Sequence, residues 1–264
     1  MHLVTSEVLD LREVAPDHWV TTFDAPEIAA AARPGQFVMV RAGPDWDPLL
    51  PRAFSIYHAD IEAGCVEILY RVVGRGTRQL ATLEPGRFAT MWGPLGRPFD
   101  LPETERVILV AGGVGVPPVV FLAERLAQAP MRLLGLVGAS SRKFLVGVEH
   151  LRRAGAEVRL ATDDGSLGHH GLVTDLLAAA LQEPGQATIY ACGPQPMLVK
   201  TARTALAAGV SCQLALEAPM ACGVGACLGC TVPRAGGSFA RVCCEGPVFA
   251  AQEIDWEAWE RGSI

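Results

Sequence analysis

A dense group of cysteines near the C-terminus limits the fold of this chain more than any other sequence feature. Cys222, Cys227, Cys230 and Cys243 follow the spacing C-x4-C-x2-C-x12-C, and Cys244 comes directly after them. Disulfide frameworks belong mainly to small secreted domains, whereas a chain of 264 residues can build a hydrophobic core without them. The group therefore indicates a loop whose thiolates converge on a metal centre.

The spacing of these cysteines is typical of plant-type [2Fe–2S] proteins. Two bridged irons need four thiolates from one loop, and Gly223, Gly225 and Gly229 let the backbone wrap closely around them. The alternative is a structural zinc site, which usually pairs two Cys-x2–4-Cys motifs. Three cysteines close together and one apart favour the cluster. Cys243 and Cys244 compete for the fourth ligand position.

Composition and charge limit the class of protein. The length of 264 residues suggests two domains with a small appendage, and 50% hydrophobic residues allow a sizeable core. The net charge of −6 argues against nucleic acid and anionic membranes as partners. The start of the chain has no basic, apolar leader, and the longest apolar run, residues 107–123, is broken by glycines and prolines. We therefore expect a cytoplasmic protein.

The first hundred residues read as short strands separated by Pro/Gly breaks. About six such strands predict a small antiparallel β-barrel, residues 1–100. Only residues 76–81 indicate a helix in this part. The clearest strands are residues 37–40, 53–57 and 65–70.

After Pro102 strands and helices alternate, which predicts an α/β domain with a doubly wound parallel sheet, residues 101–216. Residues 217–264 form a third, Cys/Gly-rich segment and tail. The predicted strands are residues 106–111, 131–137, 158–161, 188–192 and 212–216. The predicted helices are residues 117–127, 149–154, 174–181 and 195–207.

Two glycine loops follow strands of the predicted parallel sheet. Gly112-Gly113-Val114-Gly115 opens a helix, where backbone amides and the helix dipole suit a pyrophosphate. Cys192-Gly193-Pro194 ends another strand and also leads into a helix. Both loops lie at carboxyl ends of strands, where open α/β sheets bind ligands. Taken alone, each loop is also explained as a tight packing turn.

The barrel carries a second set of binding residues. Arg52 can hold a pyrophosphate, Phe54 can stack on a flavin ring and Ser55 can bond its edge. Gly76 and Thr77 open the short helix and offer a second phosphate cradle. Each residue alone is commonplace on a strand or turn, so their joint occurrence is what indicates a cofactor.

In this order the motifs resemble a known family. Residues 52–55 in a barrel, then 112–115 and 192–194 in an α/β domain, reproduce the order in ferredoxin reductase-like flavoproteins. The cysteine spacing followed by Glu245–Phe249 (Glu-Gly-Pro-Val-Phe) narrows the resemblance to the electron-transfer subunits of type B, NAD-dependent dihydroorotate dehydrogenases. The similarity runs over residues 3–250.

The resemblance implies site residues position by position. It favours Cys243 over Cys244 as fourth cluster ligand, after Cys222, Cys227 and Cys230. The residues matched to FAD are Arg52, Ala53, Phe54, Ser55, Leu69, Tyr70, Arg71, Gly76 and Thr77. The residues matched to NAD are Gly112, Gly113, Gly115, Cys192, Gly193 and Pro194, with the segment 162–166 nearby.

One residue departs from the family's flavin motif, and two cations bear on the choice between NAD and NADP. The family's flavin motif usually reads R-P-x-S, and Ala53 replaces the proline, which should loosen the strand slightly. Arg142 and Lys143 follow the second strand of the α/β domain, about where an adenosine 2′-phosphate would lie. NAD is the expected dinucleotide, and NADP stays open.

The resemblance also implies a partner. This chain lacks the length for an additional (β/α)8 barrel of about 250 residues, so an FMN-containing catalytic subunit would oxidise dihydroorotate. Electrons would pass from FMN through the cluster and FAD to NAD, in a heterotetramer with two copies of each subunit. The cluster should then lie near the surface, and we expect residues 219–231 to form the docking face.

Two alternative functions remain. One is a related subunit of ferredoxin:NAD(P)H oxidoreductases or a sulfhydrogenase gamma-type subunit, which shares the same architecture. The other is a nucleotide-binding module that is stabilised by zinc and transfers no electrons. Colour distinguishes the second alternative, because a zinc protein without flavin is colourless.

Overall fold

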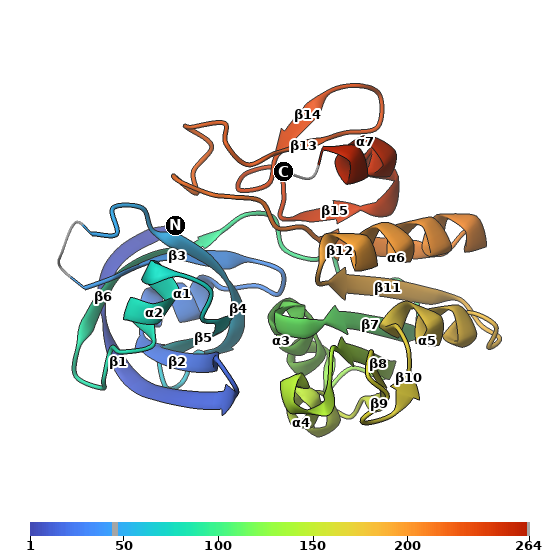
Figure 1. Ribbon diagram of the computed structural model, residues 1–264, viewed down its shortest axis with the longest axis horizontal. Helices are drawn as coiled ribbons and strands as arrows, with labels where there is room; N and C mark the ends of the chain where they lie inside the picture. Colours follow the sequence, from blue (N-terminus) through green and yellow to red (C-terminus); the bar gives the residue numbers. More distant parts are fainter. Residues whose placement is uncertain (44–46, 263–264) are drawn as a thin grey trace.

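The computed structural model describes residues 1–43 and 47–262. A barrel and an α/β unit lie side by side, and the C-terminal segment runs along one side of both (Figure 1). This arrangement confirms the predicted fold class. Among the described residues, no helix is long and apolar enough to cross a membrane.

The N-terminal unit is a closed six-stranded antiparallel barrel in the order β1-β2-β5-β4-β3-β6. Alternating side chains fill its interior, and Val8, Phe23, Ile56, Ile68 and Met91 have no exposed surface. The strands are β1 (His2–Ala15), β2 (His18–Asp24), β3 (Phe37–Ala42), β4 (Arg52–Asp60), β5 (Cys65–Arg71) and β6 (Phe88–Leu95).

Two short helices accompany the barrel. Helix α2 (Arg75–Leu80) matches the predicted helix, whereas α1 (Pro26–Ala31) was not predicted, so the expectation of a single helix was wrong. Proline suits the first turn of α1, and Ile28 and Ala29 are buried against the barrel. Six residues are too few to show a helical period in the sequence.

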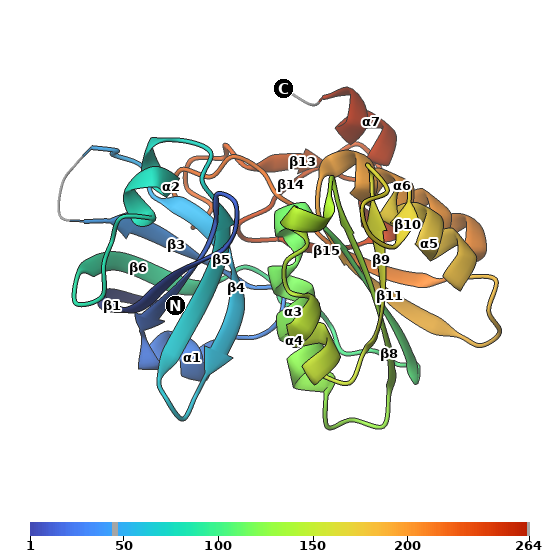
Figure 2. The same cartoon turned by 60° about the horizontal axis from the view of Figure 1, so that its bottom comes forward.

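The second unit is a twisted sheet in the order β10-β9-β8-β7-β11-β12-β15, with β15 (Val248–Ala250) at one edge and helices on both faces (Figure 2). All neighbours pair in parallel except β12 with β15. The strands are β7 (Arg106–Gly112), β8 (Arg132–Ala139), β9 (Glu157–Thr162), β10 (His169–His170), β11 (Ala187–Cys192) and β12 (Ser211–Ala215). The helices are α3 (Pro117–Leu126), α4 (Val148–Arg153), α5 (Val173–Ala180) and α6 (Gln195–Ala208).

The order of these strands defines a switch point. The chain moves from β7 outward to β8 and β9, then crosses back to β11 on the other side of β7. The carboxyl ends of β7 and β11 therefore lie next to each other, where doubly wound sheets bind dinucleotides.

The C-terminal segment is tied into the α/β sheet. Its strand β15 (Val248–Ala250) pairs antiparallel with β12 and closes that edge. A small hairpin of β13 (Thr231–Pro233) and β14 (Phe239–Arg241) and helix α7 (Trp256–Arg261) complete it. Trp256 is buried, and its indole Nε1 donates to the carbonyl of Ala251 at 2.6 Å, so the tail packs on the body.

Candidate functional site

A large cavity of about 630 Å³ lies between the barrel and the α/β unit. Its walls come from strands β4 and β5, from the loop after β7 and from the segment after β12. Eight of the nine residues that the resemblance matched to FAD line it: Arg52, Ala53, Phe54, Ser55, Leu69, Tyr70, Arg71 and Thr77. The ninth, Gly76, lines a smaller neighbouring pocket together with Arg52 and Phe54.

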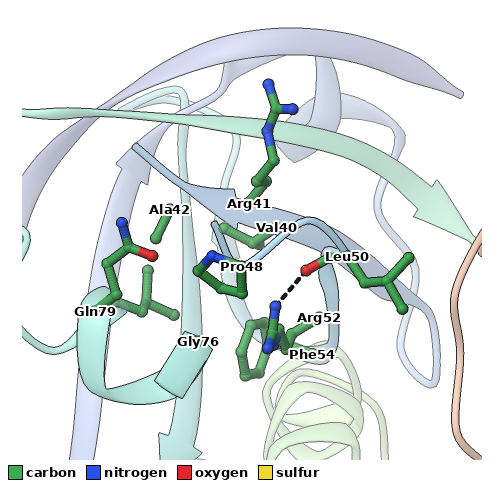
Figure 3. A pocket seen from close by; sticks show the side chains of 10 residues that line it. Val40, Arg41, Ala42, Pro48, Leu50, Arg52, Phe54, Gly76 and Gln79 are labelled. Atoms are coloured by element: carbon green, nitrogen blue, oxygen red, sulfur yellow. Dashed lines mark hydrogen bonds between the residues drawn. The ribbon is translucent and has the colours of Figure 1, made fainter. Parts of the chain in front are cut away.

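Arg52 and Gly76 touch across that smaller pocket. Figure 3 shows the guanidinium of Arg52 between the strand and helix α2, bonded to the carbonyl of Leu50. A Cβ atom added at Gly76 would lie 2.2 Å from Nε of Arg52, so only glycine leaves room for the guanidinium here. A side chain at position 76 would therefore require the guanidinium of Arg52 to move.

Phe54 and Tyr70 form an aromatic wall of the large cavity. Their ring centroids lie 5.3 Å apart at an interplanar angle of 52°. Tyr70 is buried, and its hydroxyl lies 3.2 Å from that of Thr21. Burial raises the pKa of Tyr70 to about 12, so its hydroxyl stays neutral and the wall stays uncharged. The half-buried Phe54 presents a ring suited to stacking.

Thr77 bonds to its own loop as well as lining the large cavity. Its hydroxyl accepts hydrogen bonds from the amides of Val73 and Gly74, at 2.9 and 3.1 Å, and donates to the carbonyl of Gly74. The side chain therefore fixes the loop before α2 and presents its remaining surface to the cavity.

A second cavity of about 250 Å³ lies over the switch point of the sheet. Its lining includes Gly112, Gly113, Gly115, Gly193 and Pro194, as the glycine motifs predict, together with His18, Ala139, Ser140 and Phe144. A Cβ atom at Gly115 would meet the backbone of Gly193 at 2.6 Å, so glycine is needed for the two loops to touch. Cys192 lies behind the loops, 1% exposed, and does not line the cavity.

The two cavities share three wall residues, Arg71, Val114 and Glu217. Sequence reasoning selected Arg71 but missed Glu217, which lies just beyond β12 in a segment that we read only as the start of the cysteine-rich part. The side chain is accessible from the cavities, yet desolvation by the protein around it raises the pKa of Glu217. A raised carboxyl pKa where two cavities meet is a signal for function.

The sulfur atoms of the cysteine loop come together in pairs. The thiol of Cys222 contacts that of Cys227, and the thiol of Cys243 contacts that of Cys230. The backbone amide of Cys243 also lies 3.5 Å from Sγ of Cys230. Among the residues that the structure describes, no three Cys, His, Asp or Glu side chains form a site for a single ion. Two pairs of thiolates suit two irons with two cysteines each.

Backbone amides point at the same sulfurs. Val224 N lies 3.5 Å from Sγ of Cys222, and Gly225 N lies 3.2 Å from Sγ of Cys243. Burial alone would raise the pKa of Cys222, but amide hydrogen bonds outweigh it and lower that pKa to about 6. Amides of this kind stabilise thiolate ligands. The residues present therefore fit a [2Fe–2S] cluster.

Cys243 and Cys244 differ in exposure, although their sulfurs lie only 3.7 Å apart. Cys243 is 2% exposed and points into the loop with Cys230, while Cys244 lies at the surface.

Below the loop, Arg241 bonds the Gly225 carbonyl at 3.2 Å and pairs with Glu245 at 2.7 Å. These contacts of Arg241 join the loop at Gly225 to the segment that contains Cys243.

The chain is similar to proteins of one family over most of its length. Residues 217–255 match the iron-sulfur cluster binding domain of dihydroorotate dehydrogenase B. The protein named dihydroorotate dehydrogenase B (NAD(+)), electron transfer subunit, of Desulforamulus reducens is 41% identical over 256 residues, which cover 96% of this chain and 98% of that protein. The protein of the same name from Geobacillus kaustophilus is 38% identical, covering 94% of this chain and 96% of its own.

Among solved structures, a similar chain comes from an NADH-dependent reduced ferredoxin-NADP oxidoreductase studied for flavin-based electron bifurcation. It superposes with a TM-score of 0.88 at 27% identity, covering 98% of this chain and 92% of that one. A ferredoxin reductase of carbazole 1,9a-dioxygenase matches with a TM-score of 0.69 at 25% identity, over 79% of this chain and 66% of that one.

Proposed function

The chain belongs to the family of electron transfer subunits of dihydroorotate dehydrogenase B (NAD(+)), and on that basis we propose that it carries electrons between a catalytic partner subunit and a nicotinamide dinucleotide. It would do so with FAD and a [2Fe–2S] cluster held by its own residues. The observation that carries this proposal is the common wall of the two cavities at Arg71, Val114 and Glu217. It brings two binding sites close enough for their occupants to react.

The FAD site is proposed in the 630 Å³ cavity. Arg52, seated on Gly76, would bind the pyrophosphate by charge-assisted bonds, and Phe54 would stack on the flavin. The nicotinamide dinucleotide would bind across the glycine loops, with its pyrophosphate at Gly113 and Gly115 and its nicotinamide at the common wall.

Bound FAD exchanges single electrons as well as hydride, and the cluster carries single electrons. The residues of the chain supply position and environment. Arg71 from the barrel and Glu217 from the α/β unit form the wall where the nicotinamide must meet the flavin. The cluster loop begins immediately after Met220, which lines the FAD cavity, so the cysteines are held next to it.

We further propose an FMN-containing catalytic subunit as the partner, with two copies of each subunit in the assembly. The cluster loop supplies the docking face. Val224 and Leu228 are 45% and 61% exposed in it, and Leu228 has a positive φ of 57°. Exposed apolar side chains beside a redox centre suit a protein partner.

An anaerobic visible spectrum of the purified chain, with iron, sulfide and flavin assays, tests the redox assignment. We expect one FAD and both irons of the cluster per chain, and bleaching of the flavin bands by NADH. Zinc in place of iron, with no flavin after reconstitution, would contradict the proposal. Co-purification with an FMN-containing barrel protein supports the dihydroorotate partner, and capture of a different redox protein favours the related oxidoreductases.

A further inference from the structure

His18 reaches the 250 Å³ cavity over the switch point from the barrel side. It is the first residue of strand β2, and Arg71 at the end of β5 is the other barrel residue in the lining. The remaining lining residues belong to the α/β unit or to the segment directly after it. A ligand on the glycine loops would therefore be contacted from the barrel by these two side chains.

The pairing of strands β2 and β5 fixes where His18 lies relative to Arg71. The two residues are directly opposite each other in the antiparallel ladder, so their side chains project to the same face of the barrel with Cβ atoms about 5 Å apart. Arg71 belongs to the common wall of the two cavities. His18 thus lies one strand away from the place proposed for the nicotinamide ring.

Two contacts set the orientation of the His18 ring. Nδ1 lies 2.7 Å from the carbonyl oxygen of Pro16, which can only accept, so Nδ1 carries a hydrogen. The ring also packs on Phe144, another lining residue, with centroids 5.7 Å apart and an interplanar angle of 43°. In the neutral imidazole, Nε2 is therefore the nitrogen that presents a lone pair.

The turn before His18 is held by hydrogen bonds on both sides. The amide of Asp17 donates to Oε1 of Glu13 at 3.0 Å, and the carbonyl of Asp17 accepts from the amide of Val72 at 2.8 Å. The ring is therefore placed before a ligand arrives, and binding would not need to order it.

Nε2 of His18 lacks a partner although the residue is buried. His18 is only 4% exposed, and within the described residues its side-chain hydrogen bond is the one at Nδ1. Buried polar groups are almost always hydrogen-bonded, so this acceptor should meet a donor in the bound state. Nε2 is not sealed inside the protein as the unpartnered Oγ of Ser6 is, and the ring lines the cavity. A donor on a ligand in the cavity can therefore reach it.

The parts of a nicotinamide dinucleotide differ in whether they can donate to Nε2. The pyrophosphate offers acceptor oxygens, and its proposed place is at the amides of Gly113 and Gly115. The ribose that joins it to the nicotinamide carries two hydroxyls, which can donate. This ribose is bonded directly to the ring at the common wall, so it would pass beside His18, one strand away from Arg71.

We propose that Nε2 of His18 accepts a hydrogen bond from the ribose beside the nicotinamide and so positions that ring at the common wall. The inference rests on the proposed function, because it requires a dinucleotide whose pyrophosphate lies on the glycine loops. His18 is a positioning residue, since it contacts the ribose and not the reacting carbon of the nicotinamide.

Calorimetric titration of the flavin-loaded chain with ADP-ribose and with ADP tests the contact without turnover. ADP-ribose contains the second ribose but no nicotinamide, and ADP ends at the pyrophosphate. One hydrogen bond predicts that the parent chain binds ADP-ribose about threefold to tenfold tighter than ADP. His18→Asn should lose this preference and bind ADP as before.

His18→Gln is the matched variant. Asparagine keeps an amide that can donate to the Pro16 carbonyl but falls short of the position of Nε2, whereas the amide oxygen of glutamine reaches it. Both variants lose the ring contact with Phe144, so a role in packing alone predicts the same loss in both. We expect His18→Gln to keep most of the preference. His2→Asn, which removes an exposed histidine of β1 that lines neither cavity, should keep all of it.

The outcomes separate this proposal from the proposed function. A preference for ADP-ribose that survives in His18→Asn would overturn the role of His18 and leave the dinucleotide site intact. Equal weakening of ADP and ADP-ribose in His18→Asn would also overturn it, because the contact would then lie on the adenosine side. Binding of neither ligand to the parent chain, while it holds its flavin, would contradict the dinucleotide site itself.

Discussion

Nδ1 of His58 lies 2.7 Å from Oε2 of Glu124, and this contact joins barrel strand β4 to helix α3 of the α/β unit. The other oxygen of Glu124 lies 3.4 Å from Nδ1 of His150 on α4. Two histidines therefore share one carboxylate at the junction of the two units. The 630 Å³ cavity lies between the same units, so this contact helps to hold its two sides together.

The junction should make stability depend on pH. The hydrogen bond to Glu124 raises the pKa of His58, and the two histidines lower the pKa of Glu124 against the opposing effect of burial. The contribution of His58 to the free energy of unfolding is complete below about pH 6.5, the pKa of histidine in the unfolded chain. It is lost as pH rises through the raised pKa of the folded protein. The Glu124 contribution is complete above about pH 4.3 and is lost as pH falls through its lowered pKa.

Comparing the free energy of unfolding of the chain with that of Glu124→Gln at several pH values measures this contribution. We expect a difference of about 0.5–1 kcal/mol, because the partners are partly exposed, with its maximum between about pH 4.5 and 6.5. Asp60 and Glu67 also act on His58 and stay in the variant. A difference that does not change with pH would sink the idea.

Gly76→Ala should weaken FAD binding by about tenfold or more, because the new methyl group would displace the guanidinium of Arg52. The arginine is flexible, so the fold itself should survive. Gly74→Ala is the matched control, since a Cβ atom there meets nothing within 4 Å and the backbone is extended. Flavin retention and fluorescence quenching report the FAD affinity of each variant. Equal losses of affinity in both variants would argue against a specific role of Gly76 in placing Arg52.

Glu217→Gln should stabilise the protein and slow its chemistry. Because the carboxyl pKa is raised, the ionised form destabilises the fold, so stability declines as pH rises from about 4.3 through the raised pKa. The variant should be more stable than the parent at pH 8 and equal to it near pH 4.

Flavin reduction by NADH, followed by stopped-flow absorbance, should slow by about tenfold to a hundredfold. Unchanged reduction kinetics would remove Glu217 from the site.

Cys243→Ser should lose the cluster, whereas Cys244→Ser should keep both irons. The two thiols are neighbours, but only Cys243 is buried with Cys230 and receives the amide of Gly225. Iron and sulfide assays, together with the electron paramagnetic resonance signal of the reduced chain, compare the variants. Loss of iron in Cys244→Ser alone would reverse the assignment of the fourth ligand.

Leu228→Asn should weaken capture of the partner without loss of iron or flavin. Asparagine tolerates the positive φ of this position and removes the apolar contact. Phe239→Ser removes another large exposed side chain, 70% accessible on β14 outside the cluster loop, and should leave capture unchanged. If the two variants behave alike, the docking face lies elsewhere.

Periodicity and spacing predicted the parts of this molecule that depend on near neighbours in the sequence. The strand from Arg106, the helix from Gln195 and the glycine loops lie where the sequence indicates them, because each uses a local pattern of apolar residues, glycine or proline. Helix α1 escaped prediction because one short turn has no period.

The features that sequence reasoning missed arise where distant segments meet. Glu217 becomes notable only because the end of β12 approaches β5 of the barrel, and nothing beside it in the sequence signals that. Likewise, the contact of His58 with Glu124 spans 66 positions. Strand β15 has only three residues, too few to show a strand pattern in the sequence, so its place in the sheet that begins at Arg106 was not predicted.

Strand β15 comes from the cysteine-rich segment but is hydrogen-bonded into the sheet that carries the dinucleotide loops. We therefore expect a chain that has not received its iron to keep an intact barrel and a frayed sheet edge beside β12. Such an edge is accessible to proteases, whereas in a chain that holds its cluster β15 covers it. Iron supply would then decide how long each copy survives, and the cell could clear incomplete subunits before they reach a partner.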